Sequence, residues 1–462
     1  MSPPPPDAYS PAYASTADFF PSFAPAGGLG LRPQVGARRG AARRRLAAVA
    51  GLLVGPGVLA MLGENDGPSM LSYASSGAGY GVGFFLPFIL VTFAAAYVVQ
   101  EMAMRLGAVT GRGYGELVFQ RFGRFWGWTS ALDLVATNLV TLITEVIAIR
   151  LGMGFFGVPA WAAVACAIAL VAAASFGGRY SRWERLSAGL AVFNLLFVAV
   201  ATCAHPKAGE VGRALATWGP LPKAGLSAFL LMVVSNIGAT VTPWMLFFQQ
   251  SASVDKGMGD SDIRKGRINT AIGAVVAAIA GVAALIAAAP LFAHHVDMSR
   301  FEGGAGFAQA LEPYIGHWGS SLFALGLIEA GAVAMLTISA SSAYAVGEVV
   351  KGAVCSFDAS PKQAPLFHGV NLGMTALAGA VVLIPGAPLM AISLNANLLA
   401  TILMPSALVF LLLLSNDRAI MGRHVNGRLA NWTGVGITAL VALAGGAYAV
   451  VGFLGALGVK IA

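Results

Sequence analysis

The feature that most constrains this chain is a series of apolar stretches, each about as long as a bilayer is thick. About 20 apolar residues in a helix cross the hydrocarbon core. Windows of this kind lie at 46–75, 82–106, 126–151, 159–177, 184–204, 225–252, 268–292, 318–347, 366–385, 390–414 and 433–455. Only 10% of the residues are charged, against about one quarter in soluble domains. The windows predict an all-α polytopic membrane protein with eleven transmembrane helices.

The positive charges indicate an orientation. The net charge is +8, but most of the 28 Lys and Arg residues fall in segments that share one side of the membrane if the N-terminus is cytoplasmic. The positive-inside rule then predicts a cytoplasmic N-terminus and an extracytoplasmic C-terminus in the cell (inner) membrane. The basic charge is explained by this topology, so the expected partners are the lipid bilayer and the transported substrate. No nucleic acid and no obligate protein partner is inferred.

The N-terminal region differs from the rest of the chain. Its first 35 residues are rich in Pro, Ala, Ser and Gly, a composition that buries too little apolar surface to fold. Residues 1–45 are therefore predicted to form a disordered cytoplasmic tail that ends in an Arg-rich anchor.

The motifs of common enzymes are missing from the sequence. It contains no nucleotide-binding GxxxxGK[ST], no HExxH and no nucleophile elbow, so neither an enzyme nor a bound cofactor is expected. Cys166, Cys203 and Cys355 are scattered and predict neither a disulfide framework nor a zinc site. His294, His295 and Asp297 form the one cluster that would attract a metal weakly.

Two of the windows are interrupted near their middle. The first contains Gly63-Glu64-Asn65-Asp66-Gly67-Pro68-Ser69 and the sixth contains Gly238-Ala239-Thr240-Val241-Thr242-Pro243. Pro removes a backbone donor and Gly eases departure from the helix, so carbonyl groups are freed to face a cavity. Matching breaks five windows apart are typical of an inverted-repeat transporter. The predicted units are residues 46–204 and 225–414, with an extracytoplasmic loop at 205–224 and a cytoplasmic loop with a peripheral last helix at 415–462.

Asp66 is the first candidate ligand because a carboxylate at membrane depth usually marks an ion or substrate path. It is also a favourable N-cap for the helix that restarts at Gly67-Pro68, and the two roles are compatible. Asn65 and Ser69 are candidate secondary oxygen donors. Glu64 is a ligand, a vestibule charge or the partner of a basic group.

Other spans carry polar groups that would reach the same depth. Asn138, Thr141 and Glu145 share one face of the third span; Glu145 either joins the ion path or pairs with a neighbouring helix. Glu329 lies in the eighth span without an assigned role. At the i, i+4 spacing of Glu101 and Arg105, a simple salt bridge is predicted.

The sixth and tenth spans supply the remaining candidates. Asn236 and Thr240 lead along one face to the break, where the carbonyl of Val241 and the side chain of Thr242 are candidate cation ligands. Trp244 either closes a gate beneath the site or packs in the helix. Asn397 either completes a cation shell or makes an interhelical hydrogen bond.

The sequence also resembles a known family, the NRAMP divalent-metal transporters. Gly55-Pro56-Gly57 through Asp66-Gly67-Pro68-Ser69 is similar to the family's GPG…DPGN signature, and Gly238 through Trp244 is similar to its GATVMPH. Shorter similarities include Arg105-Leu106-Gly107 and Met404-Pro405, and the resemblance extends over about residues 46–455. It implies a leucine-transporter-type fold of two five-helix repeats, with the substrate held between broken helices one and six.

Departures from the family pattern suggest a different metal preference. By this resemblance the family's metal-binding Asp falls on Asp66, its Asn on Ser69 and its Met on Thr242. The family's sixth-helix His falls on Trp244, and an acidic third-helix residue falls on Leu142. The pattern is similar to the NRAMP-related magnesium transporter branch. It implies import of partly hydrated Mg²⁺ and Mn²⁺ without obligatory proton coupling; the alternatives are a proton-coupled Mn²⁺/Fe²⁺ carrier and an organic-solute permease.

Overall fold

The computed structural model describes residues 55–176, 179–219, 225–296 and 306–456, and the described residues form helices and no strands. The predicted N-terminal tail with its Arg-rich anchor lies outside these residues, as do Asp297 and the start of the first window.

Helices of the first predicted repeat follow the windows, and their first member is broken. It consists of α2 (Pro56–Gly63) and α3 (Gly67–Tyr80). The others are α4 (Phe85–Thr110), α6 (Arg124–Phe155), α7 (Ala160–Ser175) and the sequence α8 (Tyr180–Ala191), η2 (Val192–Leu195) and α9 (Leu196–Cys203). A short helix, α5 (Tyr114–Phe122), joins α4 to α6. Between the repeats lies α10 (Ala208–Thr217).

The second predicted repeat also begins with a broken helix, made of α11 (Leu226–Gly238) and α12 (Pro243–Asp255). After the one-turn η3 (Asp260–Asp262) come α13 (Ile263–Ala293), α14 (Gly306–Val349), α15 (Pro365–Val382) and α16 (Leu389–Asn416). Two short helices, α17 (Arg418–Met421) and η5 (Gly422–His424), connect α16 to the last helix, α18 (Arg428–Ala456).

The predicted all-α architecture is confirmed, and the helix boundaries refine it. Nine helices in the described residues are long and apolar enough to cross a membrane. The broken first helix and the 16-residue α7 occupy two further windows, so the count of eleven spans and the division into two repeats stay predictions. The fifth window is interrupted at η2, which the sequence analysis did not predict. The eighth window, 318–347, matches the part of α14 that follows Gly316, where two helices meet at a kink and the non-helical φ of 74° suits glycine.

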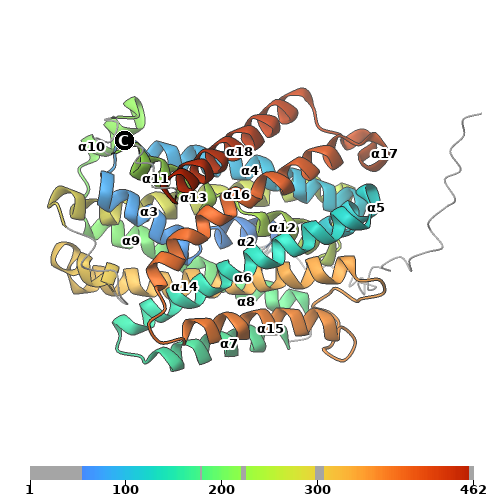
Figure 1. The fold of residues 1–462 in the computed structure, drawn as a ribbon, viewed down its shortest axis with the longest axis horizontal. Coiled ribbons are helices and arrows are strands. Elements are labelled where there is room, and N and C mark those ends of the chain that lie inside the picture. The colour runs from blue at the N-terminus through green and yellow to red at the C-terminus, as the bar shows by residue number, and fades with distance from the viewer. Residues whose placement is uncertain (1–54, 177–178, 220–224, 297–305, 457–462) are drawn as a thin grey trace, which may run out of the picture.

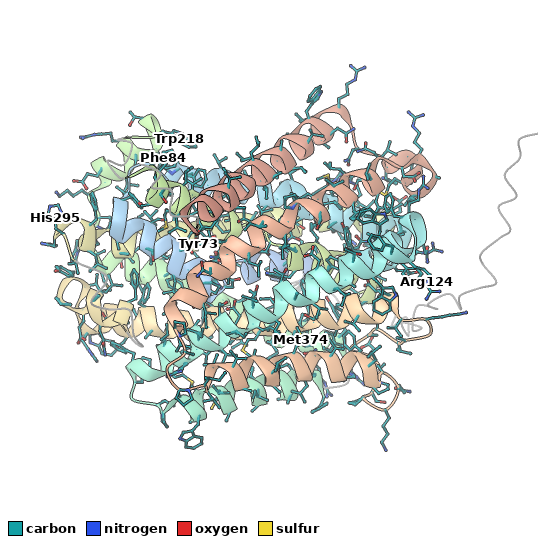
Figure 2. The ribbon with its side chains drawn as sticks, in the orientation of Figure 1. Tyr73, Phe84, Arg124, Trp218, His295 and Met374 are labelled. Carbon is teal, nitrogen blue, oxygen red and sulfur yellow. The ribbon has the colours of Figure 1, made fainter. Side chains whose placement is uncertain are left out.

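Packing places the broken helices at the centre of the bundle. Helix α13 packs against both α2 and α3, and α6 runs along α14. Figure 1 shows α2, α3 and α12 enclosed by the longer helices, with α7 and α15 along one side and α18 along the other. In Figure 2, Phe84, Trp218 and His295 lie at one end of the molecule and Arg124 at the other, with Tyr73 between them.

Gly77 allows α3 to approach α13 closely. A Cβ atom at Gly77 would lie 2.0 Å from the backbone oxygen of Leu285, whereas one at Gly79, in the same helix, would meet nothing within 4 Å. Gly77→Ala should therefore force the two backbones apart and destabilise the protein by about 1–3 kcal/mol. Gly79→Ala, the matched control, should be neutral or stabilising by up to about 1 kcal/mol. Thermal unfolding in detergent measures both; equal stability of the two variants would contradict the close approach.

Candidate metal site at the two broken helices

The break in the first helix is three residues long and completely buried. Helix α2 ends at Gly63, and Glu64, Asn65 and Asp66 carry the chain to α3 with none of their surface exposed. The Oδ1 atom of Asp66 accepts a hydrogen bond from the backbone nitrogen of Ser69 at 2.8 Å. The capping role predicted for Asp66 is thus confirmed, and its other oxygen stays available for a second role.

A direct side-chain contact joins the two breaks. Thr242, the residue before Pro243 at the start of α12, donates from Oγ1 to Oε1 of Glu64 at 2.8 Å. Trp244 is buried against Gly63, where a Cβ would lie 2.8 Å from the tip of its ring. The tightly packed indole is consistent with the packing interpretation, and the gate role stays a prediction. Val241 lies buried between the two half-helices.

Glu145 pairs with the restarted helix. From the middle of α6, its Oε2 accepts a hydrogen bond from the backbone nitrogen of Gly67, the first residue of α3, at 2.8 Å. A carboxylate at a helix N-terminus is favoured by the exposed N–H groups and the helix dipole. Gly67 must lack a side chain here because a Cβ would lie 2.2 Å from that of Ala148. The structure therefore shows that Glu145 pairs with a neighbouring helix, as one of the two predicted alternatives states. Its second oxygen is unpaired, so a role in the ion path stays a prediction.

A ladder of polar contacts continues from the breaks along α3, α11 and α16. Ser72 and Ser235 share a hydrogen bond of 2.8 Å, and Asn397 donates to Ser72 at 2.9 Å. Asn236 donates to Ser76 at 2.7 Å. Asn397 therefore makes the interhelical hydrogen bond that was one of its two predicted roles. Ser72 and Ser76 were not among the predicted residues, although their i, i+4 spacing just after the break was a usable signal.

Asn65 turns away from Asp66 toward a second polar cluster. Its amide nitrogen donates to Asn194 Oδ1 at 2.8 Å and to the Ala277 carbonyl at 2.9 Å. Asn194 lies in the unpredicted η2 turn and donates in turn to Glu329 Oε1 at 2.9 Å. The cluster gives Glu329 a partner that the sequence did not reveal. Only Oδ1 of Asn65 remains to act as the oxygen ligand that was predicted for this residue.

The remaining candidates contact other helices or their own. Asn138 donates to Ser342 of α14 at 3.0 Å. Thr141 donates to a carbonyl one turn back in α6, and Thr240, in the second break, donates to the carbonyl of Asn236 in α11. The predicted Glu101–Arg105 salt bridge is confirmed at 3.0 Å. The described residues hold no group of three His, Cys, Asp or Glu side chains suited to a metal. His294 stacks on Tyr314, and His295 meets the ring of Phe292 edge-on.

Several buried oxygens at the breaks lack a hydrogen-bond partner in the described protein. They are Oε2 of Glu64, Oδ1 of Asn65, Oδ2 of Asp66, Oγ of Ser69 and Oε1 of Glu145. Buried polar atoms are almost always paired, with protein, ordered water or an ion. Three of the five belong to carboxyl groups, and the described residues place no Lys or Arg in a salt bridge with any of those groups. Unpaired oxygens at the break in the first helix and on Glu145 are suited to a hard cation that retains some of its water.

Comparison with known proteins agrees with this geometry. A sequence model of a family described as Nramp, natural resistance-associated macrophage protein-like, matches residues 57–451. The chain belongs to the Nramp family. The match runs from α2 into α18 and contains both breaks.

Individual members share about a quarter of their residues with this Nramp chain. A divalent metal cation transporter, MntH, from Deinococcus radiodurans is 27% identical over 85% of this chain and 89% of its own. Another MntH, from Pectobacterium carotovorum subsp. carotovorum, is 25% identical over 84% of this chain and 92% of its own. These relatives are transporters, in agreement with the prediction that the chain is not an enzyme.

Solved structures establish the fold. A mutant of the Eremococcus coleocola manganese transporter superposes with a TM-score of 0.72 at 20% identity, over 89% of each chain. MHP1, a nucleobase-cation-symport-1 family transporter, superposes with a TM-score of 0.51 at 13% identity, over 86% of this chain and 92% of its own. The resemblance to the Nramp family predicted from the sequence is thus confirmed.

The contact between Glu145 and Gly67 predicts different effects for two substitutions. Glu145→Gln keeps an oxygen that can accept from Gly67, so transport should fall only a few-fold. Glu145→Ala leaves a buried N–H unpaired, which costs about 1–3 kcal/mol, and should reduce both transport and stability. Uptake into proteoliposomes and thermal unfolding in detergent measure the two effects. If Glu145→Gln is as inactive as a variant of Asp66, the charge of Glu145 belongs to the ion path.

Proposed function

We propose that the protein is a secondary transporter that imports divalent metal cations, with Mg²⁺ and Mn²⁺ as partly hydrated substrates. The observation that carries the proposal is the set of unpaired, buried oxygens at the break in the first helix, around Asp66, and on Glu145. The MntH relatives are divalent metal cation transporters, which also supports the proposal. The proposed location is the cell (inner) membrane, with the N-terminus in the cytoplasm.

The preference for Mg²⁺ and Mn²⁺ follows from the chemistry of the candidate ligands. Asp66, Ser69 and Thr242 offer only oxygen, and Thr242 lies where the resemblance places a methionine. Oxygen donors suit Mg²⁺, Ca²⁺ and Mn²⁺, whereas thioethers favour softer metals. Mg²⁺ loses its water reluctantly, and a site with few protein ligands allows it to keep some.

A flux assay tests the proposal directly. The full-length protein is reconstituted in liposomes, and entry of Mg²⁺, Mn²⁺, Ca²⁺ and Fe²⁺ is measured side by side. We expect saturable entry of Mg²⁺ and Mn²⁺, with protein-free liposomes as the background. Absence of saturable flux for all four ions would contradict metal transport. If Fe²⁺ or Cd²⁺ at equal concentration abolishes Mg²⁺ entry, the proposed site of oxygen ligands for hard cations is contradicted.

Restoring a sulfur donor should change the selectivity. Thr242→Met places a thioether beside Glu64, so transport of Cd²⁺ relative to Mg²⁺ should rise by about tenfold, equivalent to about 1.4 kcal/mol. Thr242→Leu is the matched control because it also removes the hydroxyl that donates to Glu64 without adding sulfur. Competition between the two ions in the liposome assay gives the ratio. If the ratio of Cd²⁺ to Mg²⁺ transport rises equally in both variants, its cause is the lost hydroxyl and not the thioether.

A further inference from the structure

A hollow outside the transport site lies between α4 and the beginning of α18. It has a volume of about 390 Å³ and adjoins a second hollow of about 760 Å³ beside the beginning of α13. Arg267, Arg423 and His424 line both. Both hollows lie at the end of the helices where the positive-inside rule places the cytoplasm.

Positive charge is in excess in these hollows. Their charged lining residues are four arginines, at 105, 264, 267 and 423, and two acids, Glu101 and Asp260. With His424 neutral, the excess is two positive charges. Glu101 contacts Arg105 at 3.0 Å and also Arg267 at 2.8 Å, so one carboxylate faces two guanidinium groups.

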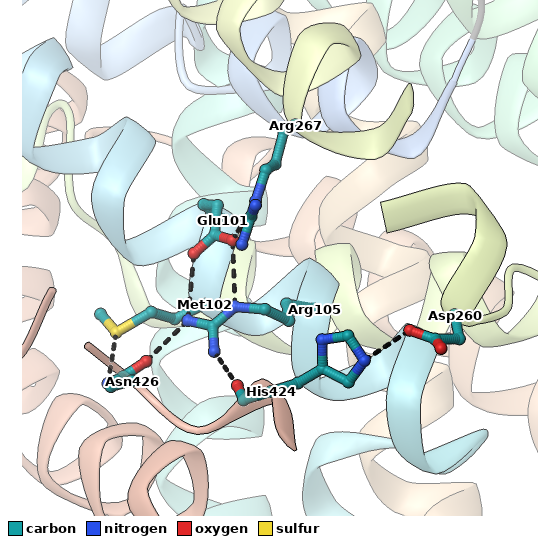
Figure 3. A network of polar contacts seen from close by, with 7 residues as sticks. All are labelled: Glu101, Met102, Arg105, Asp260, Arg267, His424 and Asn426. Carbon is teal, nitrogen blue, oxygen red and sulfur yellow. Dashed lines mark hydrogen bonds and ion pairs between the residues drawn. The ribbon is translucent and has the colours of Figure 1, made fainter. Parts of the chain in front are cut away.

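Arg105 fixes the floor of the hollow in place. It is buried, and besides Glu101 it donates to the carbonyl of His424 and, at 2.6 Å, to Oδ1 of Asn426 (Figure 3). These bonds attach the connection between α16 and α18 to α4. Arg423, which lies on this connection, is consequently held close to α4.

Three arginines at the mouth keep donors for a ligand. Arg264 is exposed and makes no ion pair in the described part of the chain. Arg267 is half exposed and Arg423 is 79% exposed, and among the described residues each contacts one carboxylate. Guanidinium groups in such positions match the oxygens of a phosphate group in pairs of parallel hydrogen bonds.

The hollow between α4 and α18 also has an apolar side. Tyr97 and Val98 of α4 face Leu429 and Ala430 of α18 across it. Leu429 and the nearby Trp432 are 78% and 77% exposed, as expected for side chains that contact lipid. A basic hollow continuous with a lipid-facing groove differs from a site for a soluble anion, which would need no apolar wall.

We propose that the two adjoining hollows together bind one anionic phospholipid of the cytoplasmic leaflet. Arg264, Arg267 and Arg423 hold its phosphate, and an acyl chain lies between α4 and α18. Basic pockets between transmembrane helices at the cytoplasmic surface suit such headgroups because that leaflet carries a negative surface potential. The lipid would link the α16–α18 connection to α4 and α13, away from the two broken helices.

The test compares two double variants that each remove two positive charges from the same end of the protein. Arg264→Gln with Arg423→Gln removes two residues that line the hollows, whereas Lys265→Gln with Arg428→Gln removes two neighbours that do not. Purified full-length protein is incubated with equal amounts of phosphatidylglycerol and phosphatidylcholine, and retained lipid is counted by native mass spectrometry. A parallel arm replaces the phosphatidylglycerol by inorganic phosphate.

The natural protein and the Lys265→Gln/Arg428→Gln control should each retain one phosphatidylglycerol molecule in preference to phosphatidylcholine. The Arg264→Gln/Arg423→Gln variant should bind it about 30-fold more weakly, because each basic residue near an anionic headgroup contributes about five- to sixfold. Equal loss in both double variants, no preference over phosphatidylcholine, or equal retention of inorganic phosphate would each overturn the proposal. A thermal unfolding scan of each variant provides a second measurement. Only the Arg264→Gln/Arg423→Gln variant should fail to gain stability from phosphatidylglycerol.

Discussion

We expect Asp66→Asn to reduce saturable Mg²⁺ and Mn²⁺ uptake by about 100-fold or more while the protein keeps nearly its full stability. Even residues that only support metal ligands change affinity by about 10–100-fold, and loss of the charge of a direct ligand should cost at least as much. Asn caps a helix about as well as Asp, so the bond from the Ser69 nitrogen to residue 66 can persist.

Two further variants separate the metal role of Asp66 from its capping role. Asp66→Ala removes both, so uptake should disappear and stability should also fall by about 1 kcal/mol. Asp417→Asn is the matched control, since Asp417 caps α17 in the same way, through the Ala419 nitrogen at 2.8 Å. It should leave uptake unchanged. Full transport by a folded Asp66→Asn protein would rule out Asp66 as the anchoring ligand.

A membrane potential alone should drive accumulation of the metal above a thousandfold. Each charge gains about 2.3 kcal/mol per 100 mV, so a divalent cation gains about 4.6 kcal/mol. Trp244 and Leu142 occupy the places where the resemblance puts titratable groups, and both side chains are buried. We therefore expect uptake that follows the potential without proportional proton entry.

The measurement uses liposomes with a potassium diffusion potential, a metal-sensitive dye and an internal pH dye. Metal entry should rise with the potential while the internal pH stays constant. Glu64, Glu145 and Glu329 are the buried carboxyl groups that would carry protons if the protein were coupled. Acidification in fixed proportion to metal entry, lost in Glu145→Gln, would favour a proton-coupled carrier over the proposed function.

The two helix breaks and the cap at Asp66 could be predicted from the sequence because they follow from local chemistry. Pro68 and Pro243 end the hydrogen-bonding pattern of the preceding helix and begin the next, whatever surrounds them. The apolar windows located the helices for the same reason: each must satisfy its own backbone in the bilayer. The turn at η2 escaped prediction because no Pro or Gly marks it.

Only the tertiary structure shows which side chains on different helices form hydrogen bonds with one another. Glu145 meets Gly67 across 78 residues of sequence, and Asn65 meets Asn194 across 129. The sequence restricted Glu145 to two roles but could not choose between them, since the choice depends on which helix faces α6 at that depth. For Asn65, the sequence predicted a donor beside Asp66, whereas packing of α13 and η2 turns its amide the other way.

The sequence by itself determined the all-helical membrane architecture, the positions of the breaks and the residue types available there. The tertiary structure decided which of those side chains keep unpaired oxygens and which are tied to other helices. Local rules act within about one helical turn, so they determine where a helix starts and stops. Contacts between helices depend on the rotation and depth of each one, which only the packing of the whole bundle sets.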